Sequence, residues 1–289
     1  MGYLFDAFEP AFMQRALIGS LVAVIATSLV GTWVVLRGLA FLGDALAHGV
    51  IPGIALAVLW GFSPIIGAFI AALVMSGLVS VVSTRTVVRE DTAIGLLFVG
   101  MLALGIVIVS RARSFSTEVT ALLFGDVLGV TVGDIRTQVI ATTVVALTTI
   151  VLYRPFLALT FNRAKAQTLG MRPRLAQMAL LTLLALSIVA SFQAIGTLLV
   201  FGLLVGPPAT ASVLVHRVPA IMVTSMALGA AAVVAGLTMS FHHGTAGGAT
   251  IAGFSVLQFF LVLITREIVV AIRHHAAPPS REPEAVPAL

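Results

Sequence analysis

The chain has 289 residues, of which 60% are hydrophobic and only 9% are charged, and its mean hydropathy is +1.15. Soluble domains carry about 25% charged residues, so this composition excludes an ordinary soluble protein and indicates a chain that resides in a lipid bilayer. The net charge of +5 comes mainly from arginines between apolar segments, a pattern that reports membrane orientation and gives no reason to expect nucleic-acid binding. Because the chain has no cysteine, disulfides, zinc–thiolate sites and iron–sulfur clusters are excluded.

Apolar segments long enough to cross a bilayer recur along the whole chain, since about 20 residues suffice for one helical crossing. Two of them, the sixth and seventh, nearly touch, so eight spans are an alternative to nine. We therefore expect an all-α, polytopic membrane protein whose residues 1–275 form one transmembrane domain. The predicted spans are 13–36, 40–60, 64–84, 92–110, 133–153, 175–193, 195–215, 219–240 and 250–272.

The distribution of basic residues predicts the orientation. With nine spans, twelve of the 16 lysines and arginines fall on the side that also holds the C-terminus, and four fall on the other side. Because cytoplasmic loops are enriched in positive charge, the C-terminal side is expected to be cytoplasmic. Residues 276–289 are rich in proline and alanine and lack apolar residues to pack, so we expect a disordered cytoplasmic tail there.

Two ionisable residues, Asp44 and His48, interrupt the second predicted span. A spacing of four places both side chains on one face of a helix. An ionisable group at the bilayer centre costs roughly 2.5–3.5 kcal/mol or more, so it is seldom there without a function. A carboxylate oxygen and an imidazole nitrogen suit zinc, manganese or ferrous iron. We expect the pair to line a metal pathway; the structural alternative is a hydrogen-bonded pair that locks two helices together.

Small residues and a proline follow the pair. Pro52 has no amide hydrogen, so the carbonyl of His48 loses its helical donor, and Pro52 is a candidate gate or kink residue. Gly49 and Gly53 form a small-xxx-small face that lets another helix approach closely. One carboxylate and one imidazole are too few for a closed metal site, and the approach of a second copy at these glycines would bring four ligands together.

The seventh predicted span contains Gly206, Pro207 and Pro208. The two prolines leave the carbonyls of Leu203 and Leu204 without helical donors and should kink or break the helix. A broken helix at membrane depth is tolerated only where it packs on protein or lines a cavity. These three residues are therefore candidate gate or kink residues, with a simple packing kink as the alternative.

The loop over 154–174 holds five positive charges and no acidic residue. The sequence predicts a short surface helix over 156–169 that ends at Gly170, since glycine suits a helix C-terminus. A positive-inside loop would explain the charges alone, whereas the apolar residues of the segment favour a docking helix for a cytoplasmic partner. The candidate docking residues are Asn162, Arg163, Lys165, Leu169 and Gly170.

Several absences narrow the function. The only lysine, Lys165, follows an alanine, so the chain has no Gly-Lys-Ser/Thr loop for binding ATP phosphates. The sequence contains no His-Glu-x-x-His motif and no nucleophile–base pair, so neither feature suggests an enzyme. The adjacent His242 and His243 fall in a predicted outer loop, where they either capture a metal loosely or have no such role.

In this order, the motifs resemble the membrane permease family of bacterial ATP-binding-cassette importers for zinc, manganese and iron. The resemblance covers nearly the whole chain, from about residue 11 to 272. The matching pieces are Val35-Leu-Arg37, Gly43-Asp44-Ala-Leu-Ala-His48-Gly-Val-Ile-Pro52-Gly53, Leu123-Phe-Gly125-Asp126, Ala166 to Gly170, Gly196-Thr-Leu-Leu-Val and Gly206-Pro207-Pro208-Ala-Thr-Ala.

This resemblance implies a homodimer in the bacterial plasma membrane. Each copy would dock through its loop helix, near 160–170, onto a separate cytoplasmic ATPase that binds ATP as a dimer. An extracytoplasmic metal-binding protein would deliver the ion. Asp44 and His48 would then bind the cargo metal transiently, and no permanent cofactor is expected.

Two other functions fit the residues themselves. A secondary cation transporter would use Asp44 as a proton site and need no ATPase. A permease for a metal chelate or siderophore would need a larger, aromatic-lined cavity, which the 17 phenylalanines, two tryptophans and two tyrosines do not favour.

Overall fold

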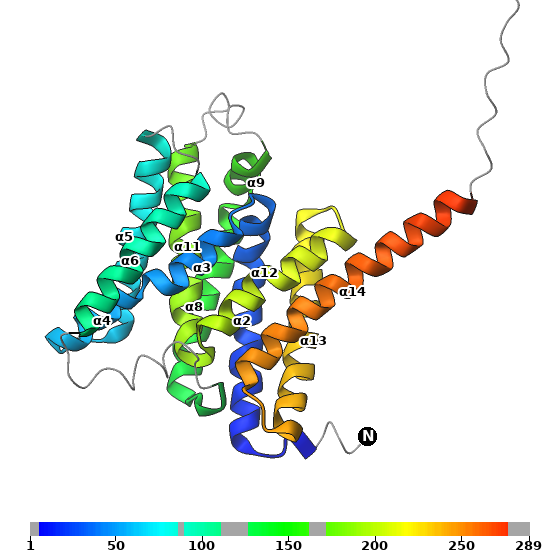
Figure 1. Ribbon diagram of the computed structural model, residues 1–289, viewed down its shortest axis with the longest axis horizontal. Coiled ribbons are helices and arrows are strands. Elements are labelled where there is room, and N and C mark those ends of the chain that lie inside the picture. Colours follow the sequence, from blue (N-terminus) through cyan, green and yellow to red (C-terminus); the bar gives the residue numbers. More distant parts are fainter. Residues whose placement is uncertain (1–5, 86–89, 111–126, 162–171, 277–289) are drawn as a thin grey trace, which may run out of the picture.

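The computed structural model describes residues 6–85, 90–110, 127–161 and 172–276, and all its regular elements in these ranges are helices (Figure 1). The prediction of an all-α protein is confirmed. A short 3-10 turn, η1 (Val127–Gly129), precedes α8. The α-helices are α2 (Ala11–Leu36), α3 (Ala40–Gly49), α4 (Ile51–Trp60), α5 (Pro64–Arg85), α6 (Glu90–Ser110), α8 (Val132–Val151), α9 (Tyr153–Phe161), α11 (Pro173–Ile195), α12 (Thr197–Leu214), α13 (Val218–His243) and α14 (Gly247–Ala276).

Within the described ranges, eight helical segments are long and apolar enough to cross a membrane, with α3 and α4 counted together, and α12 contains a shorter apolar helix at Leu199–Leu214. Figure 1 shows α2 beginning and α14 ending at opposite ends of the bundle. A chain whose first spanning helix begins on one side of the membrane and whose last one ends on the other side crosses the membrane an odd number of times. The arrangement therefore fits nine passes, in which the short α12 makes the seventh.

Helix α2 lies at the centre of the bundle and packs against α8, α11, α12 and α13. Small residues such as Ala16 and Ala23 on α2 are fully buried, which lets these neighbours approach closely. By contrast, only 6% of the apolar window of α14 is buried, against 67% for α2. Figure 1 shows why, since α14 slopes away from the other helices along its second half.

Local signals explain several helix ends. A capping box starts α8: the Asp134 N–H donates to the Thr131 hydroxyl over 3.2 Å, and the Thr131 N–H donates to the Asp134 carboxylate over 3.0 Å. Such a box satisfies amides that the first helical turn leaves without partners. Gly61 and Gly244, both with positive φ, end α4 and α13. Left-handed backbone at these positions suits glycine.

The interruption of the seventh span lies at a different place from the one predicted. Helix α12 runs without a break through Pro207 and Pro208, which lie inside it. The chain instead reverses at Gly196, with φ 78° and ψ 163°, between α11 and α12. Only glycine adopts this combination of angles readily. Of the predicted kink or break at the prolines, the break does not occur.

Two predictions fall on residues outside the described ranges. The candidate docking residues Asn162, Arg163, Lys165, Leu169 and Gly170 all lie within 162–171. The predicted tail lies outside from residue 277 onward. The beginning of the predicted docking helix is described: α9 extends from Tyr153 to Phe161.

Candidate functional site

Helix α3 has a single open stripe, and both ionisable residues lie on it. Phe41 is 43% exposed, and the side chains of Asp44 and His48 are 31% and 32% exposed. Every other residue between Leu42 and Val50 is buried. The spacing of three and then four residues puts the three open positions on one helix face. The tertiary fold thus buries the apolar sides of α3 and leaves its polar pair accessible.

The geometry of the pair does not fit a hydrogen bond that locks two helices together. The His48 Nε2 lies 3.5 Å from the Asp44 Oδ1. This distance exceeds the 2.7–3.2 Å of an N–H···O hydrogen bond. Both residues belong to α3, so their contact joins no two helices. The two side chains are partly exposed on the same open side of α3.

Aromatic rings border the pair. The His48 ring lies edge-on to Phe98 of α6 with 6.0 Å between centroids, and Phe41 contacts the same phenylalanine ring at 6.1 Å. The imidazole therefore has an apolar flank on the side of α6. Electrostatic attraction is weakly screened next to such a flank, which favours cation binding by the adjacent carboxylate.

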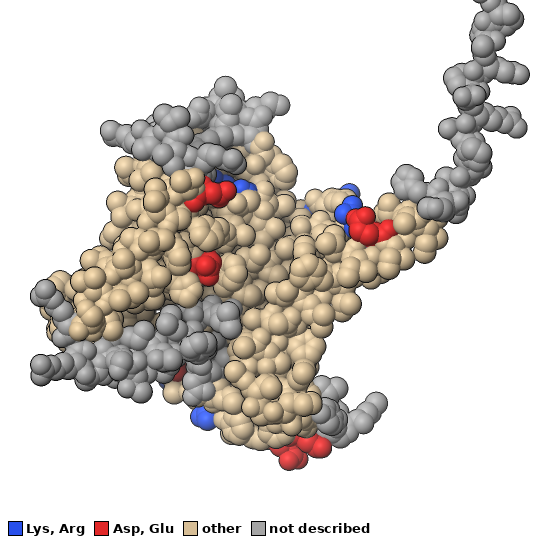
Figure 2. All heavy atoms as spheres, viewed as in Figure 1, with Lys and Arg blue, Asp and Glu red and all other residues tan. Residues whose placement is uncertain are grey.

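The pair offers too few ligands for a resident metal. Among the described residues, no group of three or more histidine, aspartate or glutamate side chains is placed to hold a metal ion. An incomplete ligand set binds an ion weakly enough to release it again, as conduction through a membrane pathway requires. Figure 2 shows that the face in view is largely uncharged and that an acidic side chain lies well inside it.

Glycines behind the pair pack within the chain itself. A Cβ on Gly53 would overlap the carbonyl of Gly67 on α5, and a Cβ on Gly67 would overlap the carbonyl of Gly53. Gly49 lies against the sulfur of Met75, also on α5. The predicted close approach at Gly49 and Gly53 occurs, but α5 of the same chain fills this face. These glycines therefore do not bring a second copy to the site.

Pro52 also serves packing. It is buried, and Gly105 of α6 lies so close that a Cβ there would be 3.2 Å from the Pro52 nitrogen. The carbonyl of His48 accepts from the N–H of Val50, where α3 ends and α4 begins. The carbonyl that Pro52 was predicted to free is therefore not without a donor.

Leucine 204 connects α12 to the back of the site. Its side chain fills the space beside Gly43, the neighbour of Asp44, and its backbone carbonyl lies against Gly31 of α2. The ring of Pro208 contacts the same glycine, since a Cβ on Gly31 would be 3.0 Å from the proline Cγ. The ring of Pro208 thus packs against Gly31. Through Leu204, α12 also packs against α3, the helix that carries Asp44 and His48.

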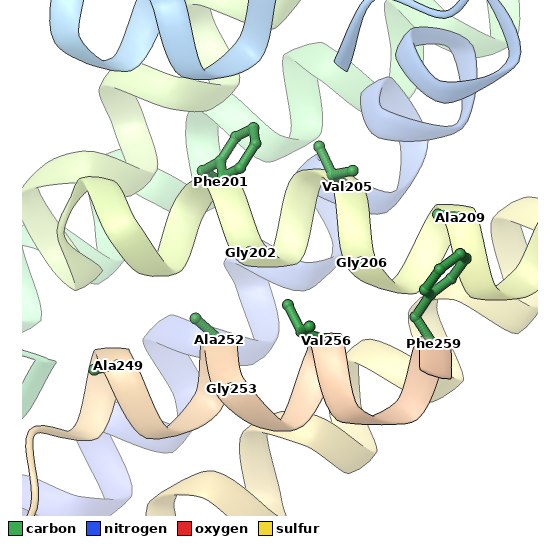
Figure 3. Close-up of a pocket in the computed structure, with 10 residues that line it drawn as sticks. All are labelled: Phe201, Gly202, Val205, Gly206, Ala209, Ala249, Ala252, Gly253, Val256 and Phe259. Atoms are coloured by element: carbon green, nitrogen blue, oxygen red, sulfur yellow. The ribbon is translucent and has the colours of Figure 1, made fainter. Parts of the chain in front are cut away.

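Helix α12 crosses α14 at two further small residues. A Cβ on Gly202 would be 2.8 Å from the Cβ of Ala252, and one on Gly206 would be 3.0 Å from that of Ser255. Figure 3 shows the open side of this crossing as an apolar groove, with the side chains of both helices along its length. Its volume is about 630 Å³. Gly206 is accordingly a close-packing position.

An aromatic cluster fixes α9 to the C-terminal end of α2. Trp33 and Phe156 are both fully buried, with 5.7 Å between their ring centroids, and Tyr153 lies 5.6 Å from the same tryptophan. Sequence reasoning missed the role of Trp33. A tryptophan near the end of a predicted span is common at membrane interfaces, so it carried no specific signal.

The two outer histidines do not form a site among the described residues. The His243 Nδ1 lies 3.2 Å from the carbonyl of Met239 in the last turn of α13. The His242 ring packs edge-on to Phe241 with 5.3 Å between centroids.

Comparisons with known proteins agree along the whole chain. A family model described as "ABC 3 transport family" matches residues 9–266. The chain is 34% identical over 268 residues to the manganese import system permease protein ScaB of Streptococcus parasanguinis, covering 91% of this chain and 95% of that protein. It is 31% identical to a probable iron transport system membrane protein of Haemophilus influenzae, covering 92% and 98% of the two chains.

A solved structure has the same fold. A chain of PsaBC from Streptococcus pneumoniae, determined in complex with Fab, matches with a TM-score of 0.80 and 30% identity, covering 90% of this chain and 94% of that one. A metal-chelate type ABC transporter in an inward-facing conformation matches with a TM-score of 0.64 at 14% identity. The second match speaks for the fold alone.

Proposed function

The chain belongs to the ABC 3 transport family, and from that premise we propose that it is the membrane-spanning permease subunit of an ATP-driven importer that moves zinc, manganese or iron into the cytoplasm. It is a multi-pass protein of the bacterial plasma membrane. The names of two relatives, a manganese import permease and a probable iron transport membrane protein, support a divalent metal as the cargo.

The observation that carries the proposal is the open stripe of α3. Asp44 and His48 face outward, whereas every other residue from Leu42 to Val50 is buried. Exposing an ionisable pair to lipid would be costly, so this stripe must face water, a partner or a pathway. A hard carboxylate next to an imidazole selects a divalent ion of borderline softness.

The proposed assembly supplies what the single chain lacks. A second copy facing the stripe would raise the two ligands to four. ATP would bind to a dimer of separate cytoplasmic ATPases, because the chain has no phosphate-binding loop of the Gly-Lys-Ser/Thr type. An extracytoplasmic metal-binding protein would deliver the ion.

The ATPase would dock at the cytoplasmic end of the bundle, on α9 and the residues that follow it. Phe161, the last residue of α9, is 68% exposed, whereas Phe156 one turn and a half earlier is buried against Trp33. One side of α9 is thus anchored in the bundle and the other is free for a partner. Asn162, Arg163, Lys165, Leu169 and Gly170 remain the proposed docking residues.

The deciding experiment measures uptake of manganese and iron by elemental mass spectrometry in cells with the gene, without it, and with Asp44→Asn. We expect the imported metal to fall in both altered strains while the variant protein still inserts in the membrane. Normal uptake with Asp44→Asn would remove the site assignment. Unchanged metal content without the gene, under scarcity of each metal, would remove the importer function.

The same cells distinguish a secondary transporter. Depleting ATP while the proton gradient is maintained should stop uptake by an ATP-driven importer. Uptake that survives ATP depletion and collapses with the gradient would instead identify Asp44 as a proton site.

A further inference from the structure

A second groove separates α12 from α14 near the cytoplasmic ends of both helices, beyond their close crossing at Gly202 and Gly206. Its volume is about 520 Å³. Its walls are apolar toward the membrane centre, with Leu214, Leu261 and Val262 among them. Its polar lining consists of His216, Thr265 and Arg266. The groove is therefore apolar along most of its length and basic at one end.

The polar end lies at the level of the lipid headgroups. Arg266 follows the start of α14 at Gly247 by 19 residues, roughly 28 Å along the axis of this inclined helix at 1.5 Å per residue. The hydrocarbon core is about 30 Å thick. His216 lies in the connection between α12 and α13, which the positive-inside pattern assigns to the cytoplasmic side. Arg266 lines the same groove as His216, so the two basic residues lie on the same side of the membrane.

Among the described residues, no side chain pairs with the two basic residues of this groove. Neither Arg266 nor His216 forms an ion pair or a side-chain hydrogen bond with another described residue. The acidic neighbour Glu267 does not line the groove, since the next residue on a helix points about 100° away. Figure 2 shows basic and acidic side chains next to each other on the outer half of α14, whereas residues 247–265 of this helix include no charged residue.

From this complementarity we propose that the groove binds an anionic phospholipid of the cytoplasmic leaflet. The phosphate accepts hydrogen bonds from the Arg266 guanidinium and a ring N–H of His216, while the Thr265 hydroxyl donates to the backbone carbonyl of Leu261 over 2.7 Å. The acyl chains lie along Leu214, Leu261 and Val262. Basic grooves between transmembrane helices on the cytoplasmic side suit such headgroups. The inference does not depend on which cargo the chain carries.

The test is native mass spectrometry of the purified chain in detergent with equal amounts of phosphatidylglycerol and phosphatidylethanolamine. The wild type should retain phosphatidylglycerol preferentially. Arg266→Gln should lower this retention about five-fold, the effect of one basic side chain near an anionic lipid surface. Arg172→Gln is the matched control, because it removes an exposed charge at the same side of the membrane outside the groove.

Two further variants separate the possible occupants. Leu214→Trp fills the groove without changing its charge and should also reduce retention; Leu214 is 51% exposed, so the fold accepts the larger ring. Because the chain has no cysteine, Thr265→Cys provides a single thiol. A disulfide between two copies through this thiol in native membranes would show that a second copy covers the groove and would overturn the proposal. Equal retention of both lipids, or retention unchanged by Arg266→Gln, would overturn it as well.

Discussion

Gly31 of α2 lies directly against the backbone carbonyl of Leu204 on α12. This is one of the two carbonyls that lose a helical donor to the paired prolines, since Pro208 follows it by four residues. The α-carbon of a glycine can approach such an oxygen closely and form a weak Cα–H···O contact. The side chain of Leu204 meanwhile packs on Gly43, next to Asp44. One residue therefore joins the central helix to the site helix.

Substitution of Gly31 tests this contact. Gly31→Ala places a methyl group on the Leu204 carbonyl, so α2 and α12 must separate. We expect a loss of roughly 1–3 kcal/mol in stability, as for other over-packed positions, together with reduced uptake. The measurement is the thermal midpoint in detergent by fluorescence-detected size exclusion. Gly100→Ala is the control, because no heavy atom lies within 4 Å of a Cβ there; equal midpoints for the two variants would disprove the close contact.

The polar pair can be tested by exchanging its residues. His48→Ala should lower uptake about tenfold or more, because a ligand lost from the metal itself matters at least as much as an outer-shell partner. The exchange Asp44→His with His48→Asp keeps both ligands on the open stripe and should retain more uptake than His48→Ala alone. Asp91→Asn, which neutralises an exposed aspartate at the start of α6, should leave uptake unchanged. An exchanged variant as inactive as His48→Ala would argue against transient metal binding by the pair.

Gly196 determines how α11 turns into α12. Its φ of 78° and ψ of 163° lie in a region that other residues avoid. Gly196→Ala should therefore cost about 1–3 kcal/mol and lower the yield of monodisperse protein. Gly77→Ala is the comparison, since Gly77 is inside α5 with open space around it and no positive φ is recorded for it. A Gly196→Ala protein with the thermal midpoint of the wild type would contradict the strain argument.

The aromatic anchor of α9 gives a fourth prediction. Phe156→Ala removes a fully buried ring from the side of Trp33 and should destabilise the protein by about 3–5 kcal/mol. Phe161→Ala, on the exposed end of the same helix, should leave the midpoint nearly unchanged. If the ATPase docks on this exposed end, Phe161→Ala will reduce co-purification of the ATPase without loss of fold. Co-purification unaffected by Phe161→Ala would place the docking surface elsewhere.

Sequence alone determined the features that depend on neighbours along the chain. The apolar segments predicted every described spanning helix to within a few residues, because a bilayer requires a fixed length of apolar helix. The spacing of four between Asp44 and His48 predicted a shared helix face for the same local reason. Motif order alone was enough to suggest the permease family.

Tertiary structure decided everything that depends on which helix lies next to which. The sequence could not show that α5 packs on Gly49 and Gly53 or that the chain reverses at Gly196. It also could not show that the two prolines pack against α2 and α13. A small-xxx-small face permits a close neighbour without naming it, and a proline removes a donor without fixing the path of the helix. The open stripe at Asp44 and His48 likewise exists only because other helices cover the remaining sides of α3.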